Sequence, residues 1–438
     1  MSAPVEYARR LNLFDATMLV IGGIIGSGIF LNPAVVAQRV GTAGLTVAAW
    51  VLGGAVALAG AFCFAELGAR KPDAGGGYVY LRDAFGPLPA FLYGWTELLV
   101  INSGGIAASS VTFATYALSL TGGRERATSL LAIAAITLLT LVNYLGIRLG
   151  SIVQNIFTVL KLLALGALIV AGIWGSHAAA PASPAPAPAG STIAALGTAL
   201  IPVLFAYGGW QSTNFVAAEL RNPARDLPRA IILGVLGVVA VYVLANVAYV
   251  SVLGPKGLAA STAPASDVMR RVVGPAGGTL IALGVAVSTF GFLNLAVLSA
   301  PRVYQAMAAD GVFFGKAAAL HPRFRAPAAA LIIQGAWAIL LLATKTYGQL
   351  LDYVVFGDWI FFGLTGATLF YYRFRTPLYP WLPLFFVLAA AFTVLSTVLS
   401  NPRNAALGGA IILAGVPAFY WWKRKGVSRE RKTVSSER

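Results

Sequence analysis

Long apolar stretches recur along almost the whole chain and are separated by short segments that hold most of the charged residues. A helix needs about 20 apolar residues to cross a hydrocarbon core of about 30 Å, and about twelve stretches reach that length. The pattern therefore predicts an all-α integral membrane protein. The expected spans are residues 12–38, 43–66, 88–120, 127–148, 152–174, 192–220, 228–253, 276–308, 328–344, 348–372, 378–400 and 404–423.

Two of the predicted spans are interrupted by closely spaced glycines, in GGIIGSGIF from Gly22 and in FAYGGWQSTN from Phe205. Backbone that leaves helical geometry at membrane depth persists only where protein or a polar ligand contacts its amides and carbonyls. Small residues also allow tight packing of membrane helices, so one such motif is ambiguous. The matched second motif favours a small-molecule binding site between the two interrupted spans.

A segment rich in proline and alanine, residues 175–191, is expected to form an extended extracellular connection, because it cannot continue a helix. Five predicted spans precede it, in residues 12–174, and five follow it, in residues 192–372. Each set opens with an interrupted span. Since each set crosses the membrane an odd number of times, the second set is inverted relative to the first, as in many secondary transporters. Two additional C-terminal helices are expected in residues 373–423.

The composition excludes a soluble protein, because 58% of the 438 residues are hydrophobic and only 11% are charged. The net charge of +16 does not indicate nucleic-acid binding, since the basic residues fall mostly on alternate loops. This asymmetry predicts that residues 1–11 and 424–438 are cytoplasmic, the latter lying against membrane lipid headgroups. The segment around Arg9 and Arg10 has no cleavage site, so the first span is expected to be retained.

The remaining chemistry argues against an enzyme and against a channel. The single cysteine, Cys63, excludes an intrachain disulfide and the usual cysteine spacings of metal sites. Both histidines, His177 and His321, fall in loops, and the sequence has neither an HExxH motif nor a nucleophile elbow. A channel would need a polar ring or a repeated filter loop. We therefore expect a transporter, with no metal and no cofactor.

Three segments together resemble the amino acid–polyamine–organocation superfamily: GGIIGSGIF, the loop FAELGARKPDAGGGYVYLRDAFG from Phe64, and FAYGGWQSTN followed by AELRNPARDLPRAI from Ala218. They are most similar to its L-type amino acid transporter group, and the resemblance covers most of residues 10–372. It implies a LeuT-type fold with a five-plus-five inverted repeat and exchange of neutral L-amino acids by alternating access. The first, second, sixth and seventh spans would rock against the third, fourth, eighth and ninth.

The resemblance places the substrate carboxylate at Gly26, Ser27 and Gly28, and the carbonyl of Ile24 beside the substrate ammonium. The physical chemistry of the motif agrees with this placement. Small residues let backbone amides approach an anion, and a half-helix that begins there presents its positive dipole end.

The second motif is expected to complete the ammonium site with the carbonyls of Phe205, Ala206 and Tyr207, which are freed where Gly208 and its neighbour break the helix. The resemblance makes the Phe205 ring a gate over the substrate and places Gly208 at the side-chain pocket. Polar side chains should also bond the unwound backbone. The candidates are Gln211 and Asn214, whereas Trp210 is interpreted as a packing residue.

Lys161 is predicted to lie about 12 Å inside an apolar helix, too deep for its side chain to reach the surface. A buried ammonium normally faces a partner or a cavity, although a shifted span boundary would make this lysine interfacial. In the L-type group, a lysine at this position approaches the first span near the place where sodium-coupled relatives hold a cation. The resemblance therefore implies sodium-independent transport. Neighbouring polar candidates are Ser288, Thr289 and Asn294, and Phe292 is a candidate for narrowing the pocket.

Other charges are assigned less specific roles. Charges near the cytoplasmic loops are interpreted as solvated, in preference to ion pairs at an inner gate, because exposed pairs contribute under ~1 kcal/mol. These are Glu66, the run from Arg70 to Asp83, Glu219, Arg221, Arg225 and Asp226. Three carboxylates near or within spans leave proton transport open, namely Glu97, Asp352 and Asp358.

Alternatives to neutral amino acid exchange remain open. One is a proton-coupled symporter. Another is a cationic amino acid or polyamine carrier, which is disfavoured because the interrupted spans contain no carboxylate for a second amine, and a third is a nontransporting sensor. In animal relatives, a cysteine between the third and fourth spans joins a heavy subunit. Here the loop TGGRERATS has no cysteine, so we expect an unaccompanied carrier in the plasma membrane of a bacterium.

Overall fold

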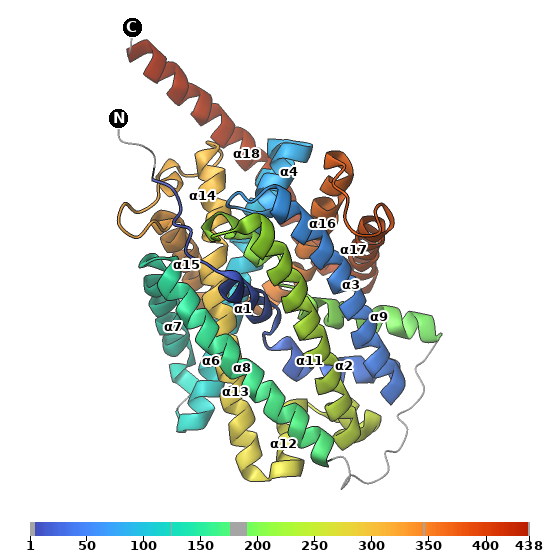
Figure 1. Ribbon diagram of the computed structural model, residues 1–438. Helices are drawn as coiled ribbons and strands as arrows, with labels where there is room; N and C mark the ends of the chain where they lie inside the picture. Colours follow the sequence, from blue (N-terminus) through green and yellow to red (C-terminus); the bar gives the residue numbers. More distant parts are fainter. Residues whose placement is uncertain (1–4, 124, 176–190, 345–346, 437–438) are drawn as a thin grey trace.

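The protein is an all-helical bundle (Figure 1). A computed structural model describes residues 5–123, 125–175, 191–344 and 347–436, and no strand is present among them. Most of the predicted linker at 175–191 lies outside these residues. Side chains are described for the same residues except 125, 347–355 and 426–436.

Among the described residues, the first half of the chain forms eight α-helices and two shorter helical turns. They are α1 (Leu13–Ile24), α2 (Gly28–Val40), α3 (Ala43–Arg70), α4 (Gly77–Phe85), α5 (Pro87–Thr96), the π-helical turn η1 (Glu97–Ile101), α6 (Asn102–Thr121), the 3-10 turn η2 (Glu125–Ala127), α7 (Thr128–Tyr144) and α8 (Ile147–Gly175).

The described residues from 191 onward form ten further α-helices. They and the 3-10 turns between them are α9 (Thr192–Tyr207), α10 (Ser212–Phe215), η4 (Ala217–Glu219), α11 (Pro223–Ala260), α12 (Pro264–Val273), α13 (Pro275–Ser299), α14 (Pro301–Ala309), η5 (Gly315–Ala318), α15 (Ala328–Ala343), α16 (Tyr347–Tyr372), α17 (Trp381–Ser400) and α18 (Pro402–Ser436).

The helices match the predicted spans in type and position. Within the described chain, 8 helical segments are long and apolar enough to cross a membrane, and the bent pair α1 and α2 makes 9. α7 and α15, with 17 and 16 residues, are shorter than the spans predicted for them. A multi-pass all-α membrane protein is thus confirmed, whereas the count of twelve spans and the division into repeats stay predictions.

Four predicted spans are not single regular helices. The spans at 12–38 and 192–220 break where the glycines predict. The span at 276–308 divides unexpectedly into α13 and α14, because Pro301 cannot donate a backbone hydrogen bond. The span at 88–120 contains the π-helical turn η1, which no local signal in its sequence predicts.

The helices pack in two sets that meet near the interrupted spans. α1, α2, α3, α9 and α11 pack on one another, and α6, α7, α13 and α15 share a separate apolar core. α8 packs against both α11 and α13. These sets correspond to the two groups of spans that the resemblance expects to rock against each other.

Both described termini lie at the same end of the bundle, and α12 lies at the opposite end (Figure 1). This arrangement agrees with an even number of crossings. Which end faces the cytoplasm stays a prediction.

Candidate functional site

The first glycine motif interrupts the first span. α1 ends at Ile24, and α2 begins at Gly28 after a bend of 42°. Ile25 between them is extended, with φ −78° and ψ 95°. The amide of Gly26 donates to the carbonyl of Ile24 at 3.0 Å, so this predicted anion donor is already engaged. In α2, the amide of Phe30 donates to the carbonyl of Ser27 at 3.1 Å, whereas those of Gly28 and Ile29 have no acceptor within the helix and can point at an anion.

The second glycine motif interrupts the sixth span. α9 ends at Tyr207, and α10 begins at Ser212. Gly209 has φ +119°, which side chains rarely tolerate. A Cβ at this residue would also overlap the carbonyl oxygen of Gly23. The glycines therefore let the two broken spans cross with their backbones in contact.

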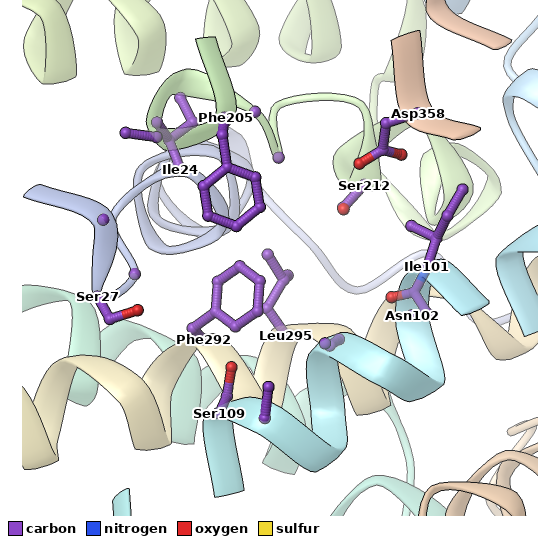
Figure 2. Close-up of a pocket in the computed structure, with 18 of the residues that line it drawn as sticks. Ile24, Ser27, Ile101, Asn102, Ser109, Phe205, Ser212, Phe292, Leu295 and Asp358 are labelled. Carbon is purple, nitrogen blue, oxygen red and sulfur yellow. The ribbon is translucent and has the colours of Figure 1, made fainter. Parts of the chain in front are cut away.

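A cavity of about 310 Å³ lies beside both breaks. Residues of η1, α6, α13 and α16 form its other walls. Figure 2 shows Ser27 on one side of the cavity and Asp358 and Ser212 on the other, with the rings of Phe205 and Phe292 turned into the space between. The volume falls in the range of small-molecule sites, which begins at about 300 Å³.

The fold brings the predicted substrate-binding residues together, with one exception. Those lining the cavity are Ile24, Gly26, Ser27, Gly28, Phe205, Ala206 and Gly208. Tyr207 is buried outside it, and its hydroxyl donates to the carbonyl of Trp50 at 3.1 Å. Contact between these residues and a substrate stays a prediction.

Tyr242 of α11 joins the two breaks, although nothing in the sequence singles it out. Its hydroxyl lies 3.0 Å from the carbonyl oxygen of Ile24 and 3.2 Å from that of Ala206. A hydroxyl has one proton and donates to one of these oxygens at a time. Because a carbonyl oxygen has two lone pairs, that of Ala206 can still accept from a ligand ammonium, whereas that of Ile24, which already accepts from the amide of Gly26, can do so only while the hydroxyl donates to Ala206.

The part of the cavity expected to hold the substrate side chain is lined by aromatic rings, which limit its space. Phe205 is 38% exposed, with its ring in the cavity (Figure 2). A Cβ at Gly208 would make only an ordinary contact, 3.4 Å from the carbonyl oxygen of Phe205. A Cβ at Gly26 would lie 3.5 Å from the ring of Phe292, so this ring limits the space opposite the first break.

Only one of the two predicted polar partners bonds the unwound backbone. The side-chain oxygen of Gln211 accepts from the amide of Gly209 at 3.0 Å, as predicted. Asn214 instead donates to the carbonyl of Phe64 in α3 at 3.0 Å, because the short helix α10 turns it away from the break. The prediction for Asn214 is therefore wrong. Trp210 is fully buried and packs, as expected.

Lys161 of α8 is fully buried and reaches the first break. Its ammonium donates to the carbonyls of Gly22 at 3.1 Å and Ile25 at 2.6 Å. These oxygens belong to the end of α1, where the helix dipole favours a cation. The hydroxyl of Ser288 lies 3.2 Å from the carbonyl oxygen of Gly26. The interfacial alternative for Lys161 is excluded.

The other two polar candidates form hydrogen bonds with groups other than the ammonium of Lys161. Thr289 is buried and hydrogen-bonds within its own helix, at 2.9 Å from a backbone carbonyl. Asn294 donates to the side chain of Gln154 in α8 at 2.9 Å. Residues that adjoin Ser288 in sequence point elsewhere, because each step along a helix turns the side chain by about 100°.

Comparison with known proteins identifies the family. The description "Amino acid permease" matches residues 11–420, nearly the whole chain. This chain belongs to the amino acid permease family. The permease is 34% identical to Large neutral amino acids transporter small subunit 2 of Homo sapiens, over 96% of the chain and 82% of that protein. It is 32% identical to the Serine/threonine exchanger SteT of Bacillus subtilis (strain 168), over 96% and 98% of the two chains.

A third relative extends over the full length of the permease. Asc-type amino acid transporter 1 of Mus musculus is 33% identical over 100% of the chain and 86% of that protein. These matches confirm the resemblance to the amino acid–polyamine–organocation superfamily near its L-type group, and with it the LeuT-type helical fold. The permease is a membrane transporter of amino acids and not an enzyme.

One charged side chain lines the cavity within the described part of the permease, that of Asp358 in α16. Glu97 in η1 is buried close to it, beside Asn102. The prediction of carboxylates within the spans is thus met at two positions, and the side chain of Asp352 lies outside those described. The sequence disfavoured a cationic amino acid or polyamine as substrate because the interrupted spans contain no carboxylate. Asp358 brings a carboxylate to the cavity from a span that is not interrupted, so this reason is weaker.

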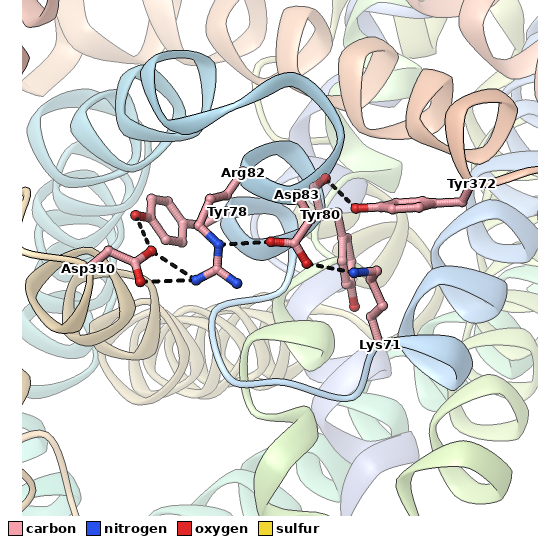
Figure 3. A network of polar contacts seen from close by, with 7 residues as sticks. All are labelled: Lys71, Tyr78, Tyr80, Arg82, Asp83, Asp310 and Tyr372. Carbon is pink, nitrogen blue, oxygen red and sulfur yellow. Dashed lines mark hydrogen bonds and ion pairs between the residues drawn. The ribbon is translucent and has the colours of Figure 1, made fainter.

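A polar network joins the ends of α3 and α14 to α4 and α16 (Figure 3). These helices lie towards the end of the permease that carries the termini (Figure 1). Asp83 pairs with Lys71 at 2.6 Å and with Arg82 at 2.9 Å, and Arg82 reaches Asp310 at 2.8 Å. Burial alone would raise the pKa of Asp83, but the bonds from Lys71 and Arg82 outweigh it and lower this pKa. These charges are ion-paired across elements, not separately solvated.

Glu219 is buried, so the interpretation of this residue as a solvated charge is wrong. It forms an ion pair with Arg302 at 2.8 Å, and both side chains are 1% exposed. Its backbone carbonyl accepts from the amides of Arg10 and Leu11. The N-terminal segment is therefore tied to the end of the second interrupted span, which a solvated loop charge would not achieve. By contrast, Glu66 pairs only with Arg70, one turn further along α3, at 2.9 Å.

Proposed function

We propose that the permease is a sodium-independent exchanger of neutral L-amino acids that works by alternating access. The observation that carries this proposal is the contact of Lys161 with the carbonyls of Gly22 and Ile25 at the first break. A tethered ammonium supplies a positive charge there without a bound metal cation. It therefore supports transport that needs no sodium.

The backbone around the cavity suits a zwitterion. The first amides of α2 would take the substrate carboxylate, because they point at an anion with the helix dipole behind them. The carbonyls of Ile24 and Ala206 would share the ammonium with the hydroxyl of Tyr242. Dipoles without formal charge can bind both ends of an amino acid.

A neutral side chain is supported by the aromatic rings in the cavity and by the relatives. Phe205 and Phe292 present apolar surface to the space beside Gly208. The names of two relatives specify large neutral amino acids and serine or threonine. The substrate of this permease is proposed to fall in the same broad class.

The packing of the helices supports alternating access. The cavity lies where the set containing α1, α2, α9 and α11 meets the set containing α6 and α13. Movement of one set against the other would open the cavity to either side in turn, with the broken spans as hinges.

We further propose that the permease lies in the plasma membrane with cytoplasmic termini and without a disulfide-linked heavy subunit. The shared position of both termini supports the topology (Figure 1). The loop TGGRERATS, which contains no cysteine, supports the absence of such a subunit.

Counterflow in proteoliposomes tests the proposed function. Vesicles loaded with an unlabelled neutral L-amino acid should accumulate the same labelled amino acid when sodium is replaced by choline. L-leucine, L-serine and L-alanine are suitable probes, and protein-free liposomes are the control. Uptake that requires sodium, or that is found only for cationic amino acids, would contradict the proposal.

A further inference from the structure

A buried carboxylate in the third span lies just behind the cavity wall. Glu97 is 1% exposed and begins the π-helical turn η1. One of its oxygens accepts from the side chain of Asn102, which lines the cavity. The other oxygen, Oε1, is buried and makes no hydrogen bond of good geometry, although the hydroxyl of Tyr93 lies within interaction range of this carboxyl. Such an oxygen is costly to leave unsatisfied within a membrane.

A second carboxylate lies on another span that packs against η1. Asp358 of α16 lines the cavity (Figure 2). α16 packs directly on η1, and a Cβ at the adjacent Gly357 would lie 3.3 Å from the side chain of Thr96 and 3.6 Å from that of Ile101, the residues that flank and end the turn. The other titratable groups that interact with this pair are the hydroxyls of Tyr93 and Tyr304. Among the described residues, no lysine, arginine or histidine acts on either carboxylate.

Elementary electrostatics limits the charge that this pair can hold. Two ionised carboxylates repel each other, and burial deprives them of the water that would screen the repulsion. A single proton removes the repulsion and gives Oε1 of Glu97 or the carboxyl of Asp358 a donor to share. Lys161 does not supply the compensating charge, because its ammonium is bound to carbonyls at the first break.

We propose that Glu97 and Asp358 form a proton-binding site that takes up a proton when an amino acid fills the cavity. The site rests on the proposed function in one respect, namely that the cavity binds a neutral amino acid. Filling the cavity removes water from Asp358, which favours the uncharged form of the pair. By linkage, a proton taken up on binding must in turn strengthen binding of the amino acid.

The sign of the pH dependence follows directly. Binding should tighten as the pH falls, because protons are then more available to the pair. The apparent Kd of L-leucine, L-serine or L-alanine should rise by up to about tenfold for each unit by which the pH increases. This limit applies where the free and the occupied permease differ by one bound proton. In calorimetry at one pH, two buffers of different ionisation enthalpy should give different binding heats, with up to one proton taken up per amino acid.

Variants of Glu97 and Asp358 test whether these two carboxylates bind the proton. In the double variant Glu97→Gln with Asp358→Asn, the apparent Kd should stay flat from about pH 5 to about pH 8. Asp358→Asn alone should reduce the proton uptake, and it keeps the buried Glu97 in place if the double variant folds poorly. Glu66→Gln is the matched control, because it also neutralises a carboxylate but breaks only a local pair on α3. It should keep the pH dependence of the wild type.

Two results would overturn the proton site while leaving the proposed function intact. The wild type could bind neutral amino acids with no pH dependence and no proton uptake, or the double variant could retain both. Markedly tighter binding of L-lysine without proton uptake would make the pair a subsite for a cationic side chain, which also overturns the proton site. Absence of binding by any neutral amino acid would instead refute the proposed function on which the site rests.

Discussion

At the scale of single residues, the side chains of Lys161 and Tyr242 both contact the interrupted spans, but the sequence predicted only the contact of Lys161. A lysine inside an apolar stretch is costly, so its presence alone indicates a buried partner. A tyrosine in the same setting costs little, and nothing marks Tyr242 until the fold places its hydroxyl between Ile24 and Ala206. A charged residue within an apolar stretch therefore indicates a buried contact from sequence alone, whereas a tyrosine there does not.

Replacing Lys161 should separate binding from transport. In Lys161→Ala, the carbonyls of Gly22 and Ile25 lose their ammonium, and the first break loses the charge that is proposed to replace sodium. We expect counterflow to slow by at least about tenfold, a barrier increase of about 1.4 kcal/mol, with a smaller change in Kd. Lys256→Ala, at an exposed position of α11, is the control. Wild-type turnover in Lys161→Ala would remove the proposed role of the lysine.

A graded series at Gly26 tests the carboxylate site. Alanine at this position meets the ring of Phe292 at an ordinary 3.5 Å, so it should be tolerated, whereas leucine extends into the cavity. We expect Gly26→Leu to weaken amino acid binding by at least about a hundredfold, roughly 2.8 kcal/mol, in a folded protein. Gly44→Leu, exposed at the start of α3, should bind normally. Retained affinity in Gly26→Leu would refute the assignment.

At the scale of elements, the function depends on two helices that break and cross. Glycine motifs predict both breaks, because glycine permits the extended and positive-φ conformations that end a helix. They do not predict that Gly23 and Gly209 touch, since that contact depends on how α1 and α9 approach one another. The π-helical turn η1 and the division between α13 and α14 likewise emerge only in the structure.

Neighbouring glycines of the second break should differ in their tolerance of alanine. In Gly209→Ala, the new methyl group would overlap the carbonyl of Gly23 at a strained φ of +119°, and we expect a loss of stability of about 1–3 kcal/mol. In Gly208→Ala, the methyl group enters the cavity without overlap, so the fold should be retained.

Thermal unfolding of the two purified variants distinguishes these outcomes. Gly208→Ala should also weaken binding of L-leucine more than binding of L-alanine, because it removes side-chain space. Equal stability of the two variants would show that the breaks do not cross as described.

At the scale of the whole molecule, ion pairs at the end with both termini connect elements that are far apart in the chain. Arg82 lies on α4, which Asp83 ties to the end of α3 through Lys71, whereas Asp310 directly follows α14 (Figure 3). Buried Glu219 and Arg302 connect the sixth span to α14 in the same region. Opening at this end requires some of these contacts to separate.

Weakening the exposed pairs should shift the permease towards a form open at that end. Each exposed pair contributes under ~1 kcal/mol, so Asp310→Asn should raise the open population by no more than about fivefold. The lowered pKa of Asp83 means that its contribution is complete at neutral pH and is lost as the pH falls through that pKa. Acidification should therefore also favour opening.

Labelling of a cysteine placed at Ser212 by an impermeant thiol reagent would measure this opening. The reagent should react faster in the Asp310→Asn background, from the side of the termini, than in the Glu66→Gln background. Cys63 is buried and should stay unreactive. Equal labelling rates would show that the network does not hold this end closed.

The sequence by itself determined the membrane class, the all-helical fold, the positions of the two breaks, the buried lysine and the family. Each of these depends on the composition of one segment and the cost of placing it in lipid, so local sequence is sufficient. Only the tertiary structure decided that Tyr242 joins the breaks, that Asn294 bonds Gln154, that Glu219 is buried against Arg302, and that the turn of Glu97 packs on the helix of Asp358. These are contacts between residues far apart in the chain, and they depend on the rotation and approach of whole helices, which no local pattern specifies.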